Sequence, residues 1–357
     1  MVTQAHPYIA TDEDIPFGPD VPLFTGVPAP QPAVLPLDLA PQQFTKEACT
    51  LKNQSERWLW WLQHRKSKDL APSSLVAFKS RLRKILEFIP EQTLLADITN
   101  DTFRSLAAQA SEPLSAKSVH ELLVTLKLIL SSAVDCHGNR MFPLILNSDF
   151  IDAPKIRDQH RPSLTAGDVE TLIALAKTEQ ERLLYIVLAS TGLRIAELQA
   201  IHIGPQDETH TTWDYGTASI YVRSSCFLDR EIPRLKTAAA RRTIHLHSNA
   251  NEVVAEFAKQ RKSGSYLFQD SEEQAVRASK VRRSMAQRLF LAAPHGFRRF
   301  RTTFLRQARL QEDILKLEIG HSSAGDITSV YSRPSDEACR AAIEAVGIGF
   351  NIGGKNA

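Results

Sequence analysis

Six side chains suited to handling a phosphate group recur through the second half of the sequence. Arg194 stands in "TGLRIAEL", directly after a glycine and behind the apolar run "LLYIVLAS", a setting that a surface cation does not need. The others are Lys236 in "LKTAAARRTIHL", His295 and Arg298 in "HGFRRFRTTFL", His321 in "IGHSS" and Tyr331 in "VYSR". His295 and Arg298 lie three apart in a helix that Pro294 should start, so they share a face.

Gathered around one phosphorus atom, these groups could break a phosphodiester bond. The two arginines would hold the tetrahedral anion by charge-assisted hydrogen bonds, and His321 would add another donor. Tyr331 is the nucleophile, because adjacent cations favour its phenolate over the neutral phenol of pKa about 10. Lys236 would protonate the leaving alkoxide and His295 would assist proton transfer. The product is a covalent phosphotyrosine, and the cations do what Mg²⁺ does elsewhere.

Each of these residues alone has an ordinary explanation. An arginine after glycine is usually a surface cation, and a tyrosine near a helix is usually a packing residue. Lys236 alone would be a solvated loop lysine, and His321 alone would cap a helix start. The joint order and spacing of six residue types in their flanking patterns is what favours a shared site.

In this order and spacing the sequence resembles the tyrosine recombinases, the phage integrase family. The family's catalytic domain carries Arg, Lys, His-x-x-Arg, Gly-His and Tyr in succession. The resemblance implies that Arg194 and Arg298 hold the scissile phosphate and that Glu197 orients the helix of the first arginine.

The same resemblance implies roles for the remaining residues. Lys236 would be the general acid on a hairpin, His295 an acid/base, His321 a phosphate donor and Tyr331 the nucleophile. Two departures stand out: Arg299 occupies a position where many members have histidine, and the interval from His321 to Tyr331 is one residue longer than the commonest form. The first departure could alter how cleavage is coupled to rejoining.

The elements that would position these residues are mostly helices. We expect a mainly α fold with a small β-sheet, made of a helical, SAM-like core-binding domain and an α+β tyrosine-recombinase catalytic domain. The expected parts are a proline-rich, disordered tail at 1–45, a helical DNA-binding domain at 46–150, a basic linker at 151–163, a catalytic domain at 164–340 and a tail at 341–357. The resemblance covers roughly residues 46–340, and the first 45 residues do not match the arm-site domain that many phage integrases carry.

The helical domain shows apolar residues at helical spacing. "PSSLVAFKSRLRKILEFIP" (72–90) has Ser73 or Ser74 as its expected N-cap and Pro90 as its stop, and the run 114–134 repeats the pattern. Basic residues lie off the apolar stripe, and a solvated face and a DNA-binding face explain them equally well. The cations expected to contact DNA are Lys79, Arg83, Lys84, Lys155, Arg157, Arg161, Arg241 and Arg242.

The catalytic domain begins with Thr165 as the N-cap of a helix. Strand-like alternation is confined to 217–226 and 241–247, with Lys236 at the turn between them. A short amphipathic helix around 335–346 would dock either on its own domain or on a neighbouring protomer.

Composition agrees with a DNA-binding protein and excludes several other classes. Residues 1–45 hold nine of the 19 prolines and five acidic but no basic residues, so the remaining chain carries a net charge of +8. Four scattered cysteines argue against a disulfide framework or a zinc ribbon. No apolar run is long enough to span a membrane, and the N-terminus lacks a secretory signal, so we expect a cytoplasmic protein.

The resemblance also implies partners. Two domains would encircle double-stranded DNA, with a dimer on each site, a tetramer in synapsis and room for an accessory DNA-bending protein. The bond energy stays in the phosphotyrosine link, so no cofactor, ATP or metal is expected.

Three alternatives stay open. A type IB topoisomerase uses similar residues, although the core-binding domain and the hairpin disfavour it. A metal-dependent nicking enzyme would use His245 and His247 of "IHLHS" together with a tyrosine. A DNA-binding protein without catalysis would need none of the six residues.

Overall fold

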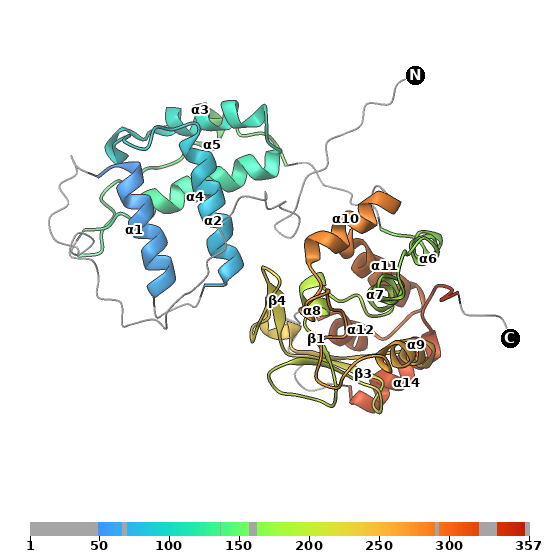
Figure 1. The fold of residues 1–357 in the computed structure, drawn as a ribbon. Helices are drawn as coiled ribbons and strands as arrows, with labels where there is room; N and C mark the ends of the chain where they lie inside the picture. The colour runs from blue at the N-terminus through green and yellow to red at the C-terminus, as the bar shows by residue number, and fades with distance from the viewer. Residues whose placement is uncertain are drawn as a thin grey trace, which may run out of the picture. The chain divides into compact units, whose positions relative to one another are not determined.

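The computed structural model describes residues 49–65, 70–135, 137–156, 163–289, 293–320 and 334–353. They belong to two compact units, unit 1 ending at Gln159 and unit 2 beginning at His160. Helices predominate and the strands form small sheets, so the expected fold class is confirmed (Figure 1). Within these ranges, no helix is both long enough and apolar enough to cross a bilayer.

Unit 1 is a helical bundle built around α4. Its elements are α1 (Leu51–His64), α2 (Pro72–Leu86), the short 3-10 helix η3 (Leu95–Asp97), α3 (Asn100–Ser111), α4 (Ala116–Ser132) and α5 (Ser148–Ile151). The apolar stripe predicted for α4 is buried from Val119 to Leu130. Helices α1, α2 and α3 all pack on α4, which therefore forms the centre of the core.

The ends of α2 differ from the prediction. Ala71 is the N-cap and Pro72 occupies the first turn, so the expectation that Ser73 or Ser74 caps the helix was wrong. Proline suits this position because its missing N–H would have no helical partner anyway. The helix also ends at Leu86, four residues before Pro90, in a turn stabilised by backbone bonds to Lys84 and Ile85.

Unit 2 surrounds α7, whose residues from Leu183 to Thr191 are all buried. Its helices are α6 (Ala166–Ala174), α7 (Glu179–Thr191), α8 (Ile195–Gln199), η4 (Ala238–Ala240), α9 (Ser248–Ala258), α10 (Ala278–Arg288), α11 (Pro294–Gln307), α12 (Glu312–Ile319) and α14 (Asp336–Val346). Helices α6, α9 and α11 pack on α7. Thr165 caps α6 through its hydroxyl and α11 begins at Pro294, as predicted.

The strands of unit 2 form a four-stranded sheet and a separate hairpin. They are β1 (Ile201–Ile203), β2 (Thr211–Asp214), β3 (Ser219–Val222), β4 (Ser225–Phe227), β5 (Arg230–Ile232) and β6 (Arg242–His245). The sheet has the order β1-β2-β3-β6, with β1 parallel to β2 and the other pairs antiparallel. The predicted run 217–226 is split between β3 and β4, and β4 pairs with β5. Lys236 therefore follows an additional hairpin rather than lying at a simple turn.

Helix α14 packs on its own unit. Cys339 and Ile343 are buried, and Ile343 joins a small cluster with Leu305, Leu315 and Ile319. This arrangement is one of the two dockings expected for the C-terminal helix. The helix also runs through residue 340, where we expected the catalytic domain to end.

Candidate active site

The corner between α7 and α8 fixes Arg194. Gly192 ends α7 with a φ of 66°, and a Cβ there would lie 3.1 Å from Ile319 and 3.3 Å from Arg301, so glycine fits this turn. Leu193 is fully buried and anchors the chain. Arg194 is then the N-cap of α8, and its Nη1 donates to Oε1 of Glu197 at 2.7 Å.

A second arginine shares the same carboxylate. Arg242, at the start of β6, donates through Nη2 to Oε2 of Glu197 at 2.9 Å and through Nε to the backbone oxygen of Glu318 at 3.1 Å. Its side chain is only 2% exposed. Burial alone would raise the pKa of Glu197, but Arg242 and then Arg194 hold that pKa at about 2.

Arg298 reaches the same place from α11. Its Nη1 donates to the backbone oxygen of Gly192 at 3.0 Å and its Nη2 to that of Ile319 at 2.5 Å. These oxygens lie at the C-terminal ends of α7 and α12, where a cation is favoured by the helix dipoles. Arg298 is 4% exposed and ties both helix ends together.

The end of α12 is shaped by Arg242. Gly320 has a φ of 73°, and a Cβ on it would lie 2.9 Å from Cδ of Arg242. The glycine of the "IGH" motif is therefore required both by the backbone conformation and by the arginine against it. The residue that follows it in the chain is His321.

These contacts bring two of the six predicted residues, Arg194 and Arg298, to one corner. Arg242 joins them: it shares the carboxylate of Glu197 with Arg194, while Arg298 bonds to the backbone oxygens of Gly192 and Ile319. The excess positive charge and the fixed donors suit an anion such as a phosphate diester.

Lys236 and His295 lie near Arg242 and Arg298, respectively, in the chain. Lys236 is exposed between β5 and η4, six residues before Arg242. His295 is exposed in the first turn of α11, one helical turn from Arg298. His321 and Tyr331 lie outside the described residues, so their roles stay predictions.

The cations expected to contact DNA have different environments. Lys79, Arg83 and Lys155 are exposed, Lys84 pairs with Glu87, and Arg241 is exposed beside Glu208. Arg157 and Arg161 lie outside the described residues. Arg242 differs from the expectation, because its guanidinium is buried against Glu197 and is not presented at the surface.

Sequence reasoning did not find the positioning role of Arg242, nor the neighbouring buried Arg301. Burial lowers the pKa of Arg301 to about 10, and its Nη1 donates to the backbone oxygen of Gly347. In the sequence both arginines stand in basic runs that read as surface charge. Only their tertiary contacts distinguish them.

The two histidines of "IHLHS" have separate partners. His245 lies with its Nδ1 2.6 Å from Oε1 of Glu318, while Nε2 of His247 lies 3.5 Å from Oε1 of Glu344. The imidazoles therefore join β6 and the chain after it to α12 and α14 respectively. This arrangement gives both residues a structural role and does not support a shared metal between them.

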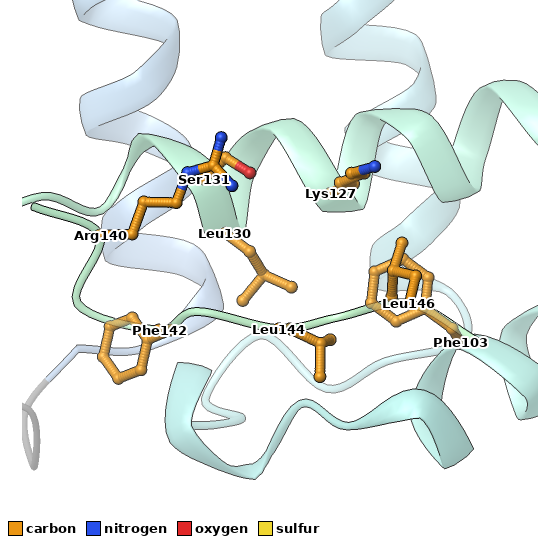
Figure 2. Close-up of a pocket in the computed structure, with 8 residues that line it drawn as sticks. All are labelled: Phe103, Lys127, Leu130, Ser131, Arg140, Phe142, Leu144 and Leu146. Atoms are coloured by element: carbon orange, nitrogen blue, oxygen red, sulfur yellow. The ribbon is translucent and has the colours of Figure 1, made fainter.

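Unit 1 contains a small hollow of about 20 Å³ between α4 and the segment 140–146 (Figure 2). Leu130, Leu144 and Phe103 contribute apolar surface, while Lys127 and Arg140 add charge. A hollow of this size holds about one water molecule, so it is no substrate pocket.

Comparison with known families agrees with the corner just described. Residues 162–338 match the model of the phage integrase family, a range that contains all six predicted residues. Unit 2 therefore matches the phage integrase family over just under half of the chain. No curated protein matches the chain by sequence.

Solved structures of integrases share this fold. The Tn1549 transposon integrase in complex with transposon right end DNA is 18% identical, with a TM-score of 0.59, and the match covers 83% of this chain and 99% of that one. A lambda integrase dimer bound to a COC′ core site is 15% identical, with a TM-score of 0.58, and covers 77% and 96%. At these identities the likeness concerns the fold alone.

Proposed function

We propose that this chain is a tyrosine-type site-specific recombinase that cleaves and rejoins DNA through a 3′-phosphotyrosine intermediate. The observation that carries the proposal is the shared corner of Arg194 and Arg298 in a unit that matches the phage integrase family. Arg194 and Arg298 come from distant segments, and their positions are fixed by buried contacts. Such prepositioned donors stabilise the charge that develops on a phosphorus centre under attack.

The reaction assigns one task to each residue. The phenol oxygen of Tyr331 attacks phosphorus as its proton passes to His295, and the bond from phosphorus to the 5′ oxygen breaks. Lys236 supplies the proton for that oxygen, which leaves a 5′-hydroxyl. The two arginines and His321 hold the non-bridging oxygens throughout. Attack by a 5′-hydroxyl from the partner strand reverses the steps and releases Tyr331.

The proposed partner is double-stranded DNA, with a dimer on each site and a tetramer in synapsis. The fold is shared with integrases solved with DNA, one of them as a dimer on a core site. Exposed cations in both units, such as Lys79, Lys155 and Arg241, would contact phosphates.

The test begins with a search for short inverted repeats in the DNA that flanks the gene, and then uses a nicked duplex that carries such a repeat and traps a cleaved strand. The wild type should form a covalent protein–DNA adduct that survives denaturing electrophoresis, and it should do so in EDTA. Tyr331→Phe should bind the same duplex with unchanged affinity and form no adduct. Tyr215→Phe is the matched control, because Tyr215 is an exposed tyrosine of the same unit and should leave the adduct unchanged. An adduct formed by Tyr331→Phe would refute the assignment of the nucleophile.

A further inference from the structure

A second cluster of reactive side chains surrounds the carboxylate of Glu231 on β5. Nε2 of His202, on β1, lies 2.8 Å from Oε2 of this carboxylate, and Nδ1 of His210 lies 3.1 Å from Oε1. One ligand atom from each of the three residues lies within 4.8 Å of the others. β1 and β6 form opposite edges of the four-stranded sheet, so the cluster is separate from the Arg242 contacts, and the proposed reaction uses none of it.

The ring of His202 is held in one orientation. Its Nδ1 lies 2.9 Å from the backbone oxygen of Gly264 and must donate a proton to it, while the ring packs on Tyr266 with centroids 4.2 Å apart. In a neutral His202 the lone pair of Nε2 therefore points at a carboxylate, and two acceptors in contact repel unless a cation lies between them. A backbone carbonyl that fixes the other ring nitrogen is a usual feature of metal-binding histidines.

Hydrogen bonds also hold His210 and Glu231 in place. Oδ1 of Asp207 accepts hydrogen bonds from the backbone nitrogens of Thr209 and His210, at 2.6 and 2.7 Å, which fixes the turn that presents His210. The hydroxyls of Ser224 and Tyr266 donate to Glu231 at 2.5 and 3.2 Å and orient its carboxylate. The side chain of His210 is 53% exposed, so an ion can enter from solvent.

We propose that His202, His210 and Glu231 form a binding site for a divalent transition metal, with Zn²⁺ as the fitting ion. Two imidazole nitrogens and one carboxylate oxygen are a ligand set that Zn²⁺ binds, with water completing four-coordination, whereas Ca²⁺ and Mg²⁺ prefer oxygen ligands alone. The site would fasten the hairpin of β4 and β5 to β1. Lys236 follows Glu231 by five residues, so the metal would steady the segment that leads to it and take no part in the chemical step.

Protons compete with the metal. Burial would lower the pKa of His202, but its bonds to Glu231 and Gly264 raise it. Burial would raise the pKa of Glu231, but hydrogen bonds from His202, Ser224 and His210 hold it at about 2. A metal must displace the proton between the two residues, so its affinity should fall as the pH is lowered.

The test titrates full-length, metal-free protein with Zn²⁺ by calorimetry near neutral pH, without DNA. The wild type should bind one ion per chain at this site, and His210→Ala should weaken that binding by at least about 100-fold. His137→Ala is the matched control, because it removes an exposed histidine of unit 1. Zn²⁺ should also slow amide hydrogen exchange in β4 and β5 of the wild type.

A second variant, in which one metal ligand replaces another, distinguishes the loss of a ligand from a loss of folding. His210→Cys should keep tight Zn²⁺ binding and, loaded with Co²⁺, should show a thiolate-to-cobalt charge-transfer band that the wild type lacks. Absence of Zn²⁺ binding in the wild type would overturn the proposal. So would binding that survives His210→Ala and disappears in Cys339→Ser, since the ion would then lie among His245, Glu318 and Cys339. Neither result would affect the proposed strand cleavage, which has its own DNA assay.

Discussion

The carboxylate of Glu197 lies between the guanidiniums of Arg194 and Arg242, and all three side chains are largely buried. A buried carboxylate with two cationic partners stays ionised, and it holds both arginines in place before any DNA arrives. Arg194 needs such a partner, because without it two cations would lie close together in a poorly solvated corner. Glu197 is therefore a positioning residue for the proposed phosphate site.

Removing the charge of Glu197 should destabilise unit 2. We expect Glu197→Gln to lower the free energy of unfolding by about 3 kcal/mol, the usual cost of breaking a buried ion pair. Glu208→Gln, which removes an exposed partner of Arg241, should cost less than about 1 kcal/mol. Denaturant unfolding of both variants measures these changes. Equal losses of unfolding free energy in the two variants would contradict the positioning role of Glu197.

The same residue predicts a pH dependence. Its pKa is lower in the folded protein than the ordinary value of 4.5, so its contribution to stability is present above pH 4.5 and is lost as the pH falls toward 2. The stability difference between the wild type and Glu197→Gln should therefore shrink across this range. Comparing the two proteins cancels the contribution of Glu231, whose pKa is also about 2. A difference that stays constant from pH 5 to pH 2 would argue against this assignment.

At the scale of elements, the glycine that ends α12 is matched to the arginine of β6. We expect Gly320→Ala to slow DNA cleavage, because its Cβ would push against Arg242 and so disturb Glu197 and Arg194. Gly138→Ala is the control, because Gly138 also has a positive φ, of 84°, but has nothing within 4 Å of the added Cβ. It should lose about 1 kcal/mol of stability from backbone strain and keep its cleavage rate. Single-turnover DNA cleavage by the two glycine variants makes the comparison. Equal cleavage rates would contradict the proposed link between Gly320 and Arg242.

The helices were predictable from sequence to the extent that they are long and amphipathic. The stripe of α4 and the starts of α6 and α11 follow from periodicity and capping residues. The strands β1 and β2 were missed because each is only three or four residues long, and β2 is buried at three successive positions instead of alternating. Strand-like residues alone cannot reveal short strands that depend on their neighbours for pairing.

The site was predictable only in part. The motifs located Arg194 and Arg298, whose contacts the structure brings together. Arg242 was read as a surface cation because "ARRT" carries no sign of burial. Its role depends on Glu197 and α12, which lie 45 and 76 residues away in the chain, so sequence spacing could not reveal it.

At the scale of the whole molecule, the described residues of each unit form a main core of their own. Between them lies the predicted basic linker 151–163, in which Lys155 is exposed. We expect brief trypsin treatment of the native protein to cut first after Lys155 or Arg157 and to leave two resistant fragments. Bound target DNA should slow this cut, since we propose that Lys155 contacts DNA phosphates. Mass spectrometry identifies the fragments, and a first cut within either core would contradict the division.

The docking of α14 connects the end of the chain to α9. The carboxylate of Glu344 accepts hydrogen bonds from the backbone nitrogen and the hydroxyl of Ser248, at 2.9 and 2.5 Å, so α14 supplies the negative charge at the start of α9. Cys339 belongs to α14, on its buried face, and is 2% exposed. If α14 undocked, the thiol of Cys339 would be exposed to oxidants in solvent. Helix α9 would also lose the charge of Glu344, which lies 96 residues after Ser248. Undocking of α14 would therefore have two measurable effects. The thiol of Cys339 would become reactive, and the first turn of α9 would fray.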